Sequence, residues 1–197
     1  MPSPAPNTRD FGGVPAPTPV ERIVLTGFMG SGKSTVGRAL AQRLGWRFVD
    51  LDTLIEQRDG RAVSRIFAEN GEPAFRALET EALTSSLTEP RLVIALGGGA
   101  LETEANRHAL GAASQTCTVL LTATFETLYQ RCEQQIAAAA DSSLPIRPLL
   151  GDREAAATRL ARREANYHST ANLILDTTGQ QPEQSVKALL ALLSGVV

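Results

Sequence analysis

The residues best suited to chemistry stand together in one stretch, which reads Gly-Phe-Met-Gly-Ser-Gly-Lys-Ser-Thr from Gly27 to Thr35. It matches the pattern G-x-x-x-x-G-K-[ST], the Walker A loop, which lies between a strand and a helix. The apolar run 23–25 and the stretch 36–44 supply that context. Glycines let the backbone turn its N–H groups inward, and a helix N-terminus adds partial positive charge. The stretch therefore predicts a phosphate site for a nucleoside triphosphate, whereas a chance glycine-rich turn would leave the flanking elements unexplained.

The side chains of this loop have separate expected roles. We expect Lys33 to reach the β- and γ-phosphates as a mobile point charge, and the Ser34 hydroxyl to be a ligand of Mg²⁺. The residues expected to bind the nucleotide are Gly30, Ser31, Gly32, Lys33, Ser34 and Thr35. Mg²⁺ is accordingly the expected cofactor.

Two aspartates, Asp50 and Asp52, follow the loop and its helix. We expect residues 47–52 to form a short strand, whose period-2 alternation would point both side chains to one side. Ligands of parallel sheets bind beyond the carboxyl ends of the strands, so both aspartates would face the phosphate loop. Asp50 would help to hold Mg²⁺ through water, and Asp52 would accept a proton from a hydroxyl. The alternative for either residue is that it only caps a helix.

Three consecutive glycines, Gly97, Gly98 and Gly99, come directly after the apolar run 92–96. Glycine weakens the end of a strand and offers no side chain to pack. It does allow a ligand to approach the backbone and to bond its N–H groups. A simple turn needs only one or two glycines, so the triple glycine favours a ligand site.

From Glu21 onward, apolar runs typical of strands alternate with helical patterns. The expected strands are 23–25, 47–52, 92–96, 116–121 and 173–175. The expected helices are 36–44, 53–58, 63–70, 73–87, 104–110, one from about 125 with Thr124 as its N-cap, 153–169 and 182–193. This alternation predicts an α/β fold with a mainly parallel sheet and helices on both faces. A single domain over residues 21–197 is expected, preceded by a proline-rich, disordered leader at 1–20.

Composition narrows the possible partners. A net charge of −2 gives no general basic surface for nucleic acid or membrane. No apolar run reaches the ~18 residues of a membrane span, and the leader lacks the apolar core of a secretory signal. Cys117 and Cys132 form no C-x-x-C pair, which favours reduced thiols in a cytoplasmic protein. Metal or redox roles are not expected for them.

Six motifs, in family order, make the chain resemble the shikimate kinases. They are G-F-M-G-S-G-K-S-T at 27–35, D-x-D at 50–52, G-E-x-x-F-R at 71–76, A-L-G-G-G-A at 95–100, R-P-L-L at 147–150 and R-x-x-x-Y at 163–167. The resemblance implies that the γ-phosphate of ATP is transferred to the 3-hydroxyl of shikimate, a step towards chorismate and the aromatic amino acids. It also implies a three-layer P-loop kinase fold, with a five-stranded parallel sheet, helices on both faces and a mobile lid at about 141–151. We expect the protein to be a monomer that binds ATP and shikimate.

The resemblance further implies roles for side chains outside the loop. Asp52 would bind the reacting hydroxyl and act as the base, and Asp50 would lie on the magnesium side. Arg76 and Arg163 would grip the substrate carboxylate, which suits the planar fork of arginine. The other implied contacts are the pocket glycines Gly97, Gly98 and Gly99, the lid residue Arg147 near the phosphates, and Arg131 near adenine. The catalytic residues would be Asp52, Lys33 and Arg147.

The chain departs from the family pattern in two places. The segment between Arg131 and Arg147 is longer than usual, which puts the adenine role of Arg131 and the manner of lid closure in question. The segment 176–182 lacks an arginine that some members place near adenine. Adenine contacts there would be mostly with the backbone.

Two other functions share parts of this sequence pattern. Gluconate kinases have the same loop and an acidic pair, but they lack the triple glycine and the R-P-L-L motif. A nucleotide-binding regulator without turnover would not need its catalytic side chains, yet these are all in place, namely Lys33, Ser34, Asp52 and Arg147.

Overall fold

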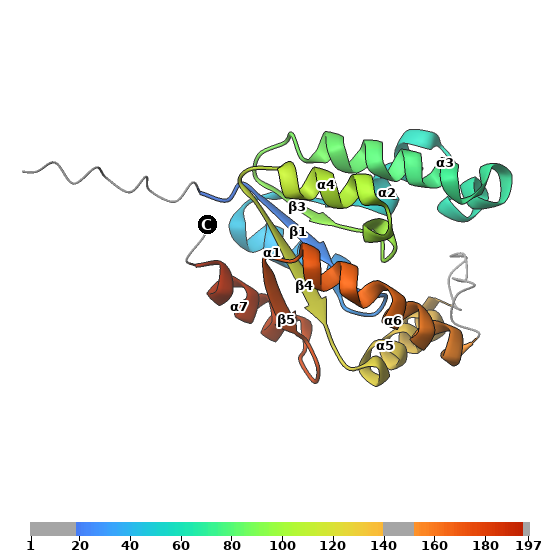
Figure 1. Ribbon diagram of the computed structural model, residues 1–197. Coiled ribbons are helices and arrows are strands. Elements are labelled where there is room, and N and C mark those ends of the chain that lie inside the picture. The colour runs from blue at the N-terminus through green and yellow to red at the C-terminus, as the bar shows by residue number, and fades with distance from the viewer. Residues whose placement is uncertain (1–18, 140–151, 195–197) are drawn as a thin grey trace, which may run out of the picture.

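Residues 19–139 and 152–194 are described by the computed structural model, and they build one five-stranded parallel sheet between layers of helices (Figure 1). The strands are β1 (Arg22–Thr26), β2 (Arg47–Asp50), β3 (Leu92–Ala95), β4 (Thr116–Thr122) and β5 (Leu173–Asp176). They lie in the order β2-β3-β1-β4-β5, and every neighbouring pair is parallel. The predicted α/β fold class is therefore confirmed.

The helices follow the predicted positions closely. They are α1 (Lys33–Leu44), α2 (Leu51–Asp59), α3 (Val63–Ser86), α4 (Glu104–Ala112), α5 (Phe125–Ala139), α6 (Arg153–Thr170) and α7 (Pro182–Leu193), with a short 3₁₀ helix, η1 (Ala100–Glu102). The two helices expected at 63–70 and 73–87 are the two halves of α3. They meet at Gly71, whose φ of 79° and ψ of 173° break the helical path. Only glycine adopts this conformation readily, so the kink is fixed by the sequence.

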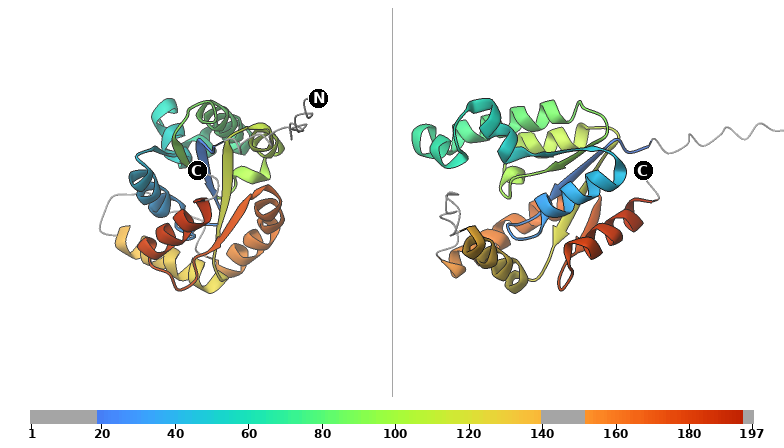
Figure 2. Two further views of the ribbon diagram at one scale, coloured as in Figure 1. Left: turned by 90° about the vertical axis from the view of Figure 1, so that its left-hand side faces the viewer. Right: turned by 180° about the vertical axis from the view of Figure 1, so that it is seen from behind.

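Apolar side chains alternate along the strands and build a core on each face of the sheet. Ile23 and Leu25 pack with α1 and α7 on one face, while Val24 packs with α2, α3, α4 and α6 on the other. Figure 2 shows these helices on opposite sides of the strands. Burying a large apolar side chain stabilises the fold by about 1.5–3 kcal/mol. Because both faces are covered, the carboxyl end of the sheet is the edge left for a ligand.

The predicted end of the strand 47–52 is wrong. β2 stops at Asp50, which is the N-cap of α2 and accepts a hydrogen bond from the backbone N–H of Thr53 at 3.4 Å. Asp52 lies in the first turn of α2 rather than in the strand. The alternation argument for its direction therefore fails, because a helical turn and not a pleated strand sets where its side chain points.

Some of the expected features lie outside the residues that the structure describes. The predicted lid at 141–151, with Arg147, lies outside the described residues, and so does all but the end of the predicted leader. Within the described ranges, no helix combines the length and apolar character that a membrane crossing requires.

Candidate active site

The phosphate loop connects β1 to α1 and depends on glycine at several positions. Gly27, Gly30 and Gly32 have φ angles of 136°, 77° and 91°, which side-chain-bearing residues rarely adopt. A Cβ on Gly27 would lie 2.2 Å from the carbonyl oxygen of Leu121, and one on Gly30 would lie 2.3 Å from that of Leu128. The loop is thus pressed against the backbone of β4 and α5, which fixes its shape.

Lys33 folds back over this loop. Its Nζ donates hydrogen bonds to the carbonyl oxygens of Gly27 at 2.8 Å and of Phe28 at 2.9 Å. Lys33 is also the first residue of α1, whose leading N–H groups have no partner within the helix. The lysine charge and the helix N-terminus therefore act on the same space, which favours an anion there.

Ser34 and Asp50 are brought into direct contact. The Ser34 hydroxyl donates to Asp50 Oδ2 at 2.6 Å, although the residues lie in α1 and at the end of β2. A hydroxyl and a carboxylate are hard oxygen ligands of the kind that Mg²⁺ prefers. The pair fits a divalent cation beside the phosphate loop.

Gly97 and Gly98 lie between the acidic groups and the phosphate loop. A Cβ on Gly97 would lie 2.8 Å from Asp52 Oδ1 and 3.1 Å from Glu79 Oε1. A Cβ on Gly98 would lie 3.8 Å from the backbone nitrogen of Met29, within the phosphate loop. The triple glycine therefore lets two carboxylates and the phosphate loop approach one another across bare backbone.

Arg76 and Arg163 converge at the third glycine. A Cβ on Gly99 would lie 2.7 Å from Arg76 Nη2 and 3.0 Å from Arg163 Nη2. The two side chains come from α3 and α6, and only 17% and 11% of their surfaces are exposed. The pair predicted from the sequence is thus brought together, next to the predicted glycines.

Each arginine is oriented by carboxylates. Arg76 donates to Glu79 Oε2 at 2.8 Å and to Glu72 Oε1 at 3.0 and 3.2 Å. Arg163 donates to Glu102 Oε2 at 2.8 Å through Nε and lies 2.7 Å from it through Nη2. Glu72 lies four residues before Arg76, a spacing that brings the two side chains together on a helix. Glu79 and Glu102, in contrast, were not identified from the sequence.

Glu79 is a fully buried carboxyl group within this cluster. Burial raises its pKa to about 7, the nearby charges of Arg76 and Arg163 oppose this rise, and Asp52 adds to it. Among the described residues, its Oε1 has no hydrogen-bond partner. The spacing of three residues from Arg76, one helical turn, was the signal in the sequence that could have pointed to it.

Tyr167 fastens α6 to the triple glycine. Its hydroxyl donates a short hydrogen bond to the carbonyl oxygen of Gly98. Burial raises the pKa of Tyr167 to about 12, against the opposing effect of Arg163, so the hydroxyl keeps its proton at neutral pH. The tyrosine of the R-x-x-x-Y motif thus holds Arg163 at the glycines by holding its helix.

Arg131 has a different environment. It donates to the Thr177 hydroxyl at 3.0 Å and to the carbonyl oxygens of Thr177 and Gln180 at 2.7 and 3.1 Å. These bonds tie α5 to the turn after β5. Its contact with adenine stays a prediction.

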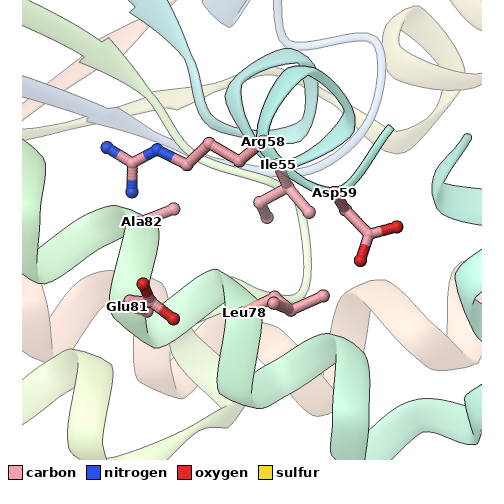
Figure 3. A pocket seen from close by; sticks show the side chains of 6 residues that line it. All are labelled: Ile55, Arg58, Asp59, Leu78, Glu81 and Ala82. Carbon is pink, nitrogen blue, oxygen red and sulfur yellow. The ribbon is translucent and has the colours of Figure 1, made fainter. Parts of the chain in front are cut away.

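A separate hollow of about 190 Å³ lies between α2 and α3 (Figure 3). Its lining consists of Ile55, Arg58, Asp59, Leu78, Glu81 and Ala82. None of these residues is a predicted site residue, so the hollow is not counted as part of the site.

The comparisons with known proteins agree with one another. A family model described as shikimate kinase matches residues 29–194. The shikimate kinase of Geobacter metallireducens is 43% identical over 185 residues, which cover 92% of this chain and 97% of the relative. A solved structure of the shikimate kinase from Acinetobacter baumannii, in complex with shikimate, superimposes with a TM-score of 0.76 and 32% identity, and the match covers 89% of this chain and 94% of that one. A gluconokinase from Sinorhizobium meliloti is similar in fold alone, with a TM-score of 0.57 and 19% identity over 89% of this chain and 92% of that one.

Proposed function

The chain belongs to the shikimate kinase family, and from this premise we propose how its residues carry out the reaction of the family. In that reaction, ATP phosphorylates the 3-hydroxyl of shikimate to give shikimate 3-phosphate and ADP, in the biosynthesis of chorismate and the aromatic amino acids. A new bond forms between the hydroxyl oxygen and the γ-phosphorus, and the bond from the γ-phosphorus to the β,γ-bridging oxygen breaks. The hydroxyl proton must be taken up by a base.

The phosphate loop would hold the triphosphate. The first N–H groups of α1 and the Lys33 ammonium would face the phosphates, and Lys33 would exchange its bonds to the Gly27 and Phe28 carbonyls for bonds to phosphate oxygens. Phosphoryl transfer needs positioning and neutralisation of charge more than covalent catalysis. A fixed loop with a mobile lysine meets both needs.

Ser34 and Asp50 would hold Mg²⁺, the serine directly and the aspartate through water. The ion supplies charge neutralisation at the phosphates when it is bound. In the described part of the chain, no group of three or more His, Cys, Asp or Glu side chains is placed to hold a metal ion. Ser34 and Asp50 would therefore hold the ion together with the bound nucleotide, as kinases usually do, and not as a cage made of protein side chains alone.

Asp52 would accept the proton of the 3-hydroxyl. It lies beside Gly97 and in the first turn of α2, close to the end of β2 that carries Asp50. Glu79 approaches the same glycine, but it is fully buried and accepts a hydrogen bond from Arg76, so we assign the role of base to Asp52. The substrate would lie against the glycines with its hydroxyl towards the phosphate loop.

Arg76 and Arg163 would bind the carboxylate of shikimate. The observation that carries the whole proposal is the triple glycine, which has the carboxylate groups at its first residue, the phosphate loop at its second and the two arginines at its third. A small anionic polyol placed along this backbone would therefore contact the base, the phosphate donor and the arginine clamp at the same time. In the solved structures, the A. baumannii relative is bound to shikimate itself.

A coupled assay of ADP release tests the function. We expect weak ATP hydrolysis without an acceptor and fast turnover with shikimate. The panel should include gluconate and nucleoside monophosphates, since kinases of similar fold act on such substrates. A higher kcat/KM for any of these than for shikimate would overturn the proposed substrate.

A further inference from the structure

The carboxylate of Glu102 lies between the two arginines of the proposed clamp. Arg163 reaches Glu102 Oε2 at 2.8 Å through Nε and 2.7 Å through Nη2, and Arg76 Nη2 lies 3.9 Å from the same oxygen. A Cβ built on Gly99 would lie 3.1 Å from this oxygen and about as close to both arginine nitrogens. One carboxylate oxygen of the protein therefore already lies within ion-pair distance of both arginines.

Glu102 also has a second, outer partner. Its Oε1 lies 2.6 Å from Nη2 of Arg162, whose side chain is 68% exposed, against 11% for Arg163. Arg107 Nη1 donates to the carbonyl oxygen of Glu102 at 3.1 Å and so holds the backbone at this point. The side chain of Glu102 can thus turn from the inner arginine to the outer one while its backbone stays in place.

We propose that Glu102 sets the affinity of the site for shikimate, because its carboxylate occupies the arginine clamp and must move outward onto Arg162 when the substrate carboxylate binds. The inference rests on the proposed clamp of Arg76 and Arg163. Two carboxylates a few ångströms apart repel each other, so both cannot use the inner edge of Arg163 at once. Substrate binding is then an exchange of one carboxylate for another, and its free energy includes the cost of moving Glu102.

This exchange has a structural reason. A buried arginine without a partner is costly, and Glu102 keeps Arg163 paired and oriented until the substrate arrives. Burial alone would raise the pKa of Glu102, but its bonds to Arg163 and Arg162 hold the pKa below the usual value. The group therefore moves as an anion, which is why an outer arginine is needed to receive it.

The first test is calorimetric titration of shikimate into Glu102→Gln, which removes the charge and keeps the size. We expect the Kd for shikimate to fall roughly 5- to 20-fold, between the effect of an exposed ion pair and that of a hydrogen bond to a charge, while the Kd for ATP stays constant. Glu104→Gln, an exposed change two residues away, is the matched control and should change neither value. A Kd that is unchanged or higher in Glu102→Gln would mean that Glu102 only supports Arg163, and the proposal would be wrong.

Arg162→Gln gives the opposite expectation. Without the outer arginine, Glu102 stays on Arg163, so shikimate should bind more weakly, and the double variant should bind as tightly as Glu102→Gln alone. Equal weakening in all three variants would overturn the proposal. Thermal unfolding of each variant shows that it is folded before titration.

A third comparison separates this inference from the clamp itself. Arg163→Lys is titrated with shikimate and with its uncharged methyl ester. Selective loss of shikimate binding supports the clamp, and the Glu102 results then decide the present inference alone. Equal loss for both ligands would overturn the clamp assignment, and the Glu102 inference with it.

Discussion

The Ser34 hydroxyl donates a 2.6 Å hydrogen bond to Asp50, and this bond joins the first turn of α1 to the end of β2. β1 and β2 are not neighbours in the sheet, since β3 lies between them. The phosphate loop after β1 and the two aspartates, at the end of β2 and the start of α2, nevertheless lie close together, because the carboxyl ends of parallel strands meet at one edge. The bond marks where we place Mg²⁺.

Asp50→Asn should weaken the use of Mg²⁺. The amide keeps the shape of the side chain but loses its charge. Replacing a residue that acts on a metal ion through a bound water or another ligand typically lowers the metal affinity roughly 10–100-fold. The Mg²⁺ concentration for half-maximal activity should rise on that scale at saturating ATP and shikimate. Glu81→Gln, an exposed change on α3, is the control. An unchanged Mg²⁺ requirement would leave Asp50 as a helix cap only.

Asp52→Asn should remove the base. General-base catalysis typically contributes about 10²–10⁴-fold, so kcat should fall by that factor, while the Kd values of both substrates change little. Rapid-quench measurement of a single turnover tests the chemical step directly. Turnover close to that of the unmodified protein would exclude Asp52 from proton transfer.

Gly99→Ala should damage the substrate site without straining the backbone. Gly99 has a φ of −102°, which alanine adopts freely, but the new Cβ would lie 2.7 Å from Arg76 Nη2. Misplacing binding groups by about 1 Å can cost roughly 10²-fold, and we expect such a loss in kcat/KM for shikimate. Gly111→Ala is the matched control, since among the described residues no atom beyond its chain neighbours and its own helix backbone lies within 4 Å of its Cβ position. That helical change should keep the activity and raise stability by about 0.5–1 kcal/mol.

Much of the fold could be predicted from the sequence because the signals are local. The positions of the phosphate loop, the triple glycine and α7 follow from glycine conformation, apolar runs and the first-turn proline. Asp52 was placed in a strand because the alternation of residues 47–52 cannot show that Asp50 caps a helix. The pattern alone does not separate a strand end from a helix start.

Glu79 and Glu102 could not be found in the same way. The spacing of Glu79 from Arg76 marks it as a helical neighbour, but the burial of Glu79 and the contacts of Glu102 depend on what packs around them. Glu79 is buried because α3 lies against the triple glycine, and Glu102 meets Arg163 because η1 lies against α6. Such contacts join residues up to 61 positions apart and arise only from the folded topology.

Glu79 should make stability depend on pH. Its pKa is raised from 4.5 to about 7 in the folded protein, so between these values the folded state binds more protons than the unfolded chain. The contribution of Glu79 to the free energy of unfolding therefore falls as pH rises through this window and is constant above it. We therefore expect the free energy of unfolding of Glu79→Gln, minus that of the unmodified protein, to increase as the pH is raised from 5 to 8. Urea unfolding at several pH values measures this difference. A difference that does not change with pH would show that Glu79 is ionised throughout.

Arg76→Lys should weaken shikimate binding with little effect on ATP. A hydrogen bond to a charged group contributes about 1.5–3 kcal/mol, which corresponds to roughly 10- to 150-fold in Kd. Lysine keeps the charge but cannot form the planar fork, so it should rescue little. Arg65→Lys, in the exposed half of α3 and paired with Glu69, is the control and should bind shikimate normally. The decisive ligand is the uncharged methyl ester of shikimate, whose binding Arg76→Lys should leave almost unchanged. If the ester and shikimate lose affinity equally, Arg76 supports the packing of α3 through Glu72 and Glu79 and does not hold the carboxylate.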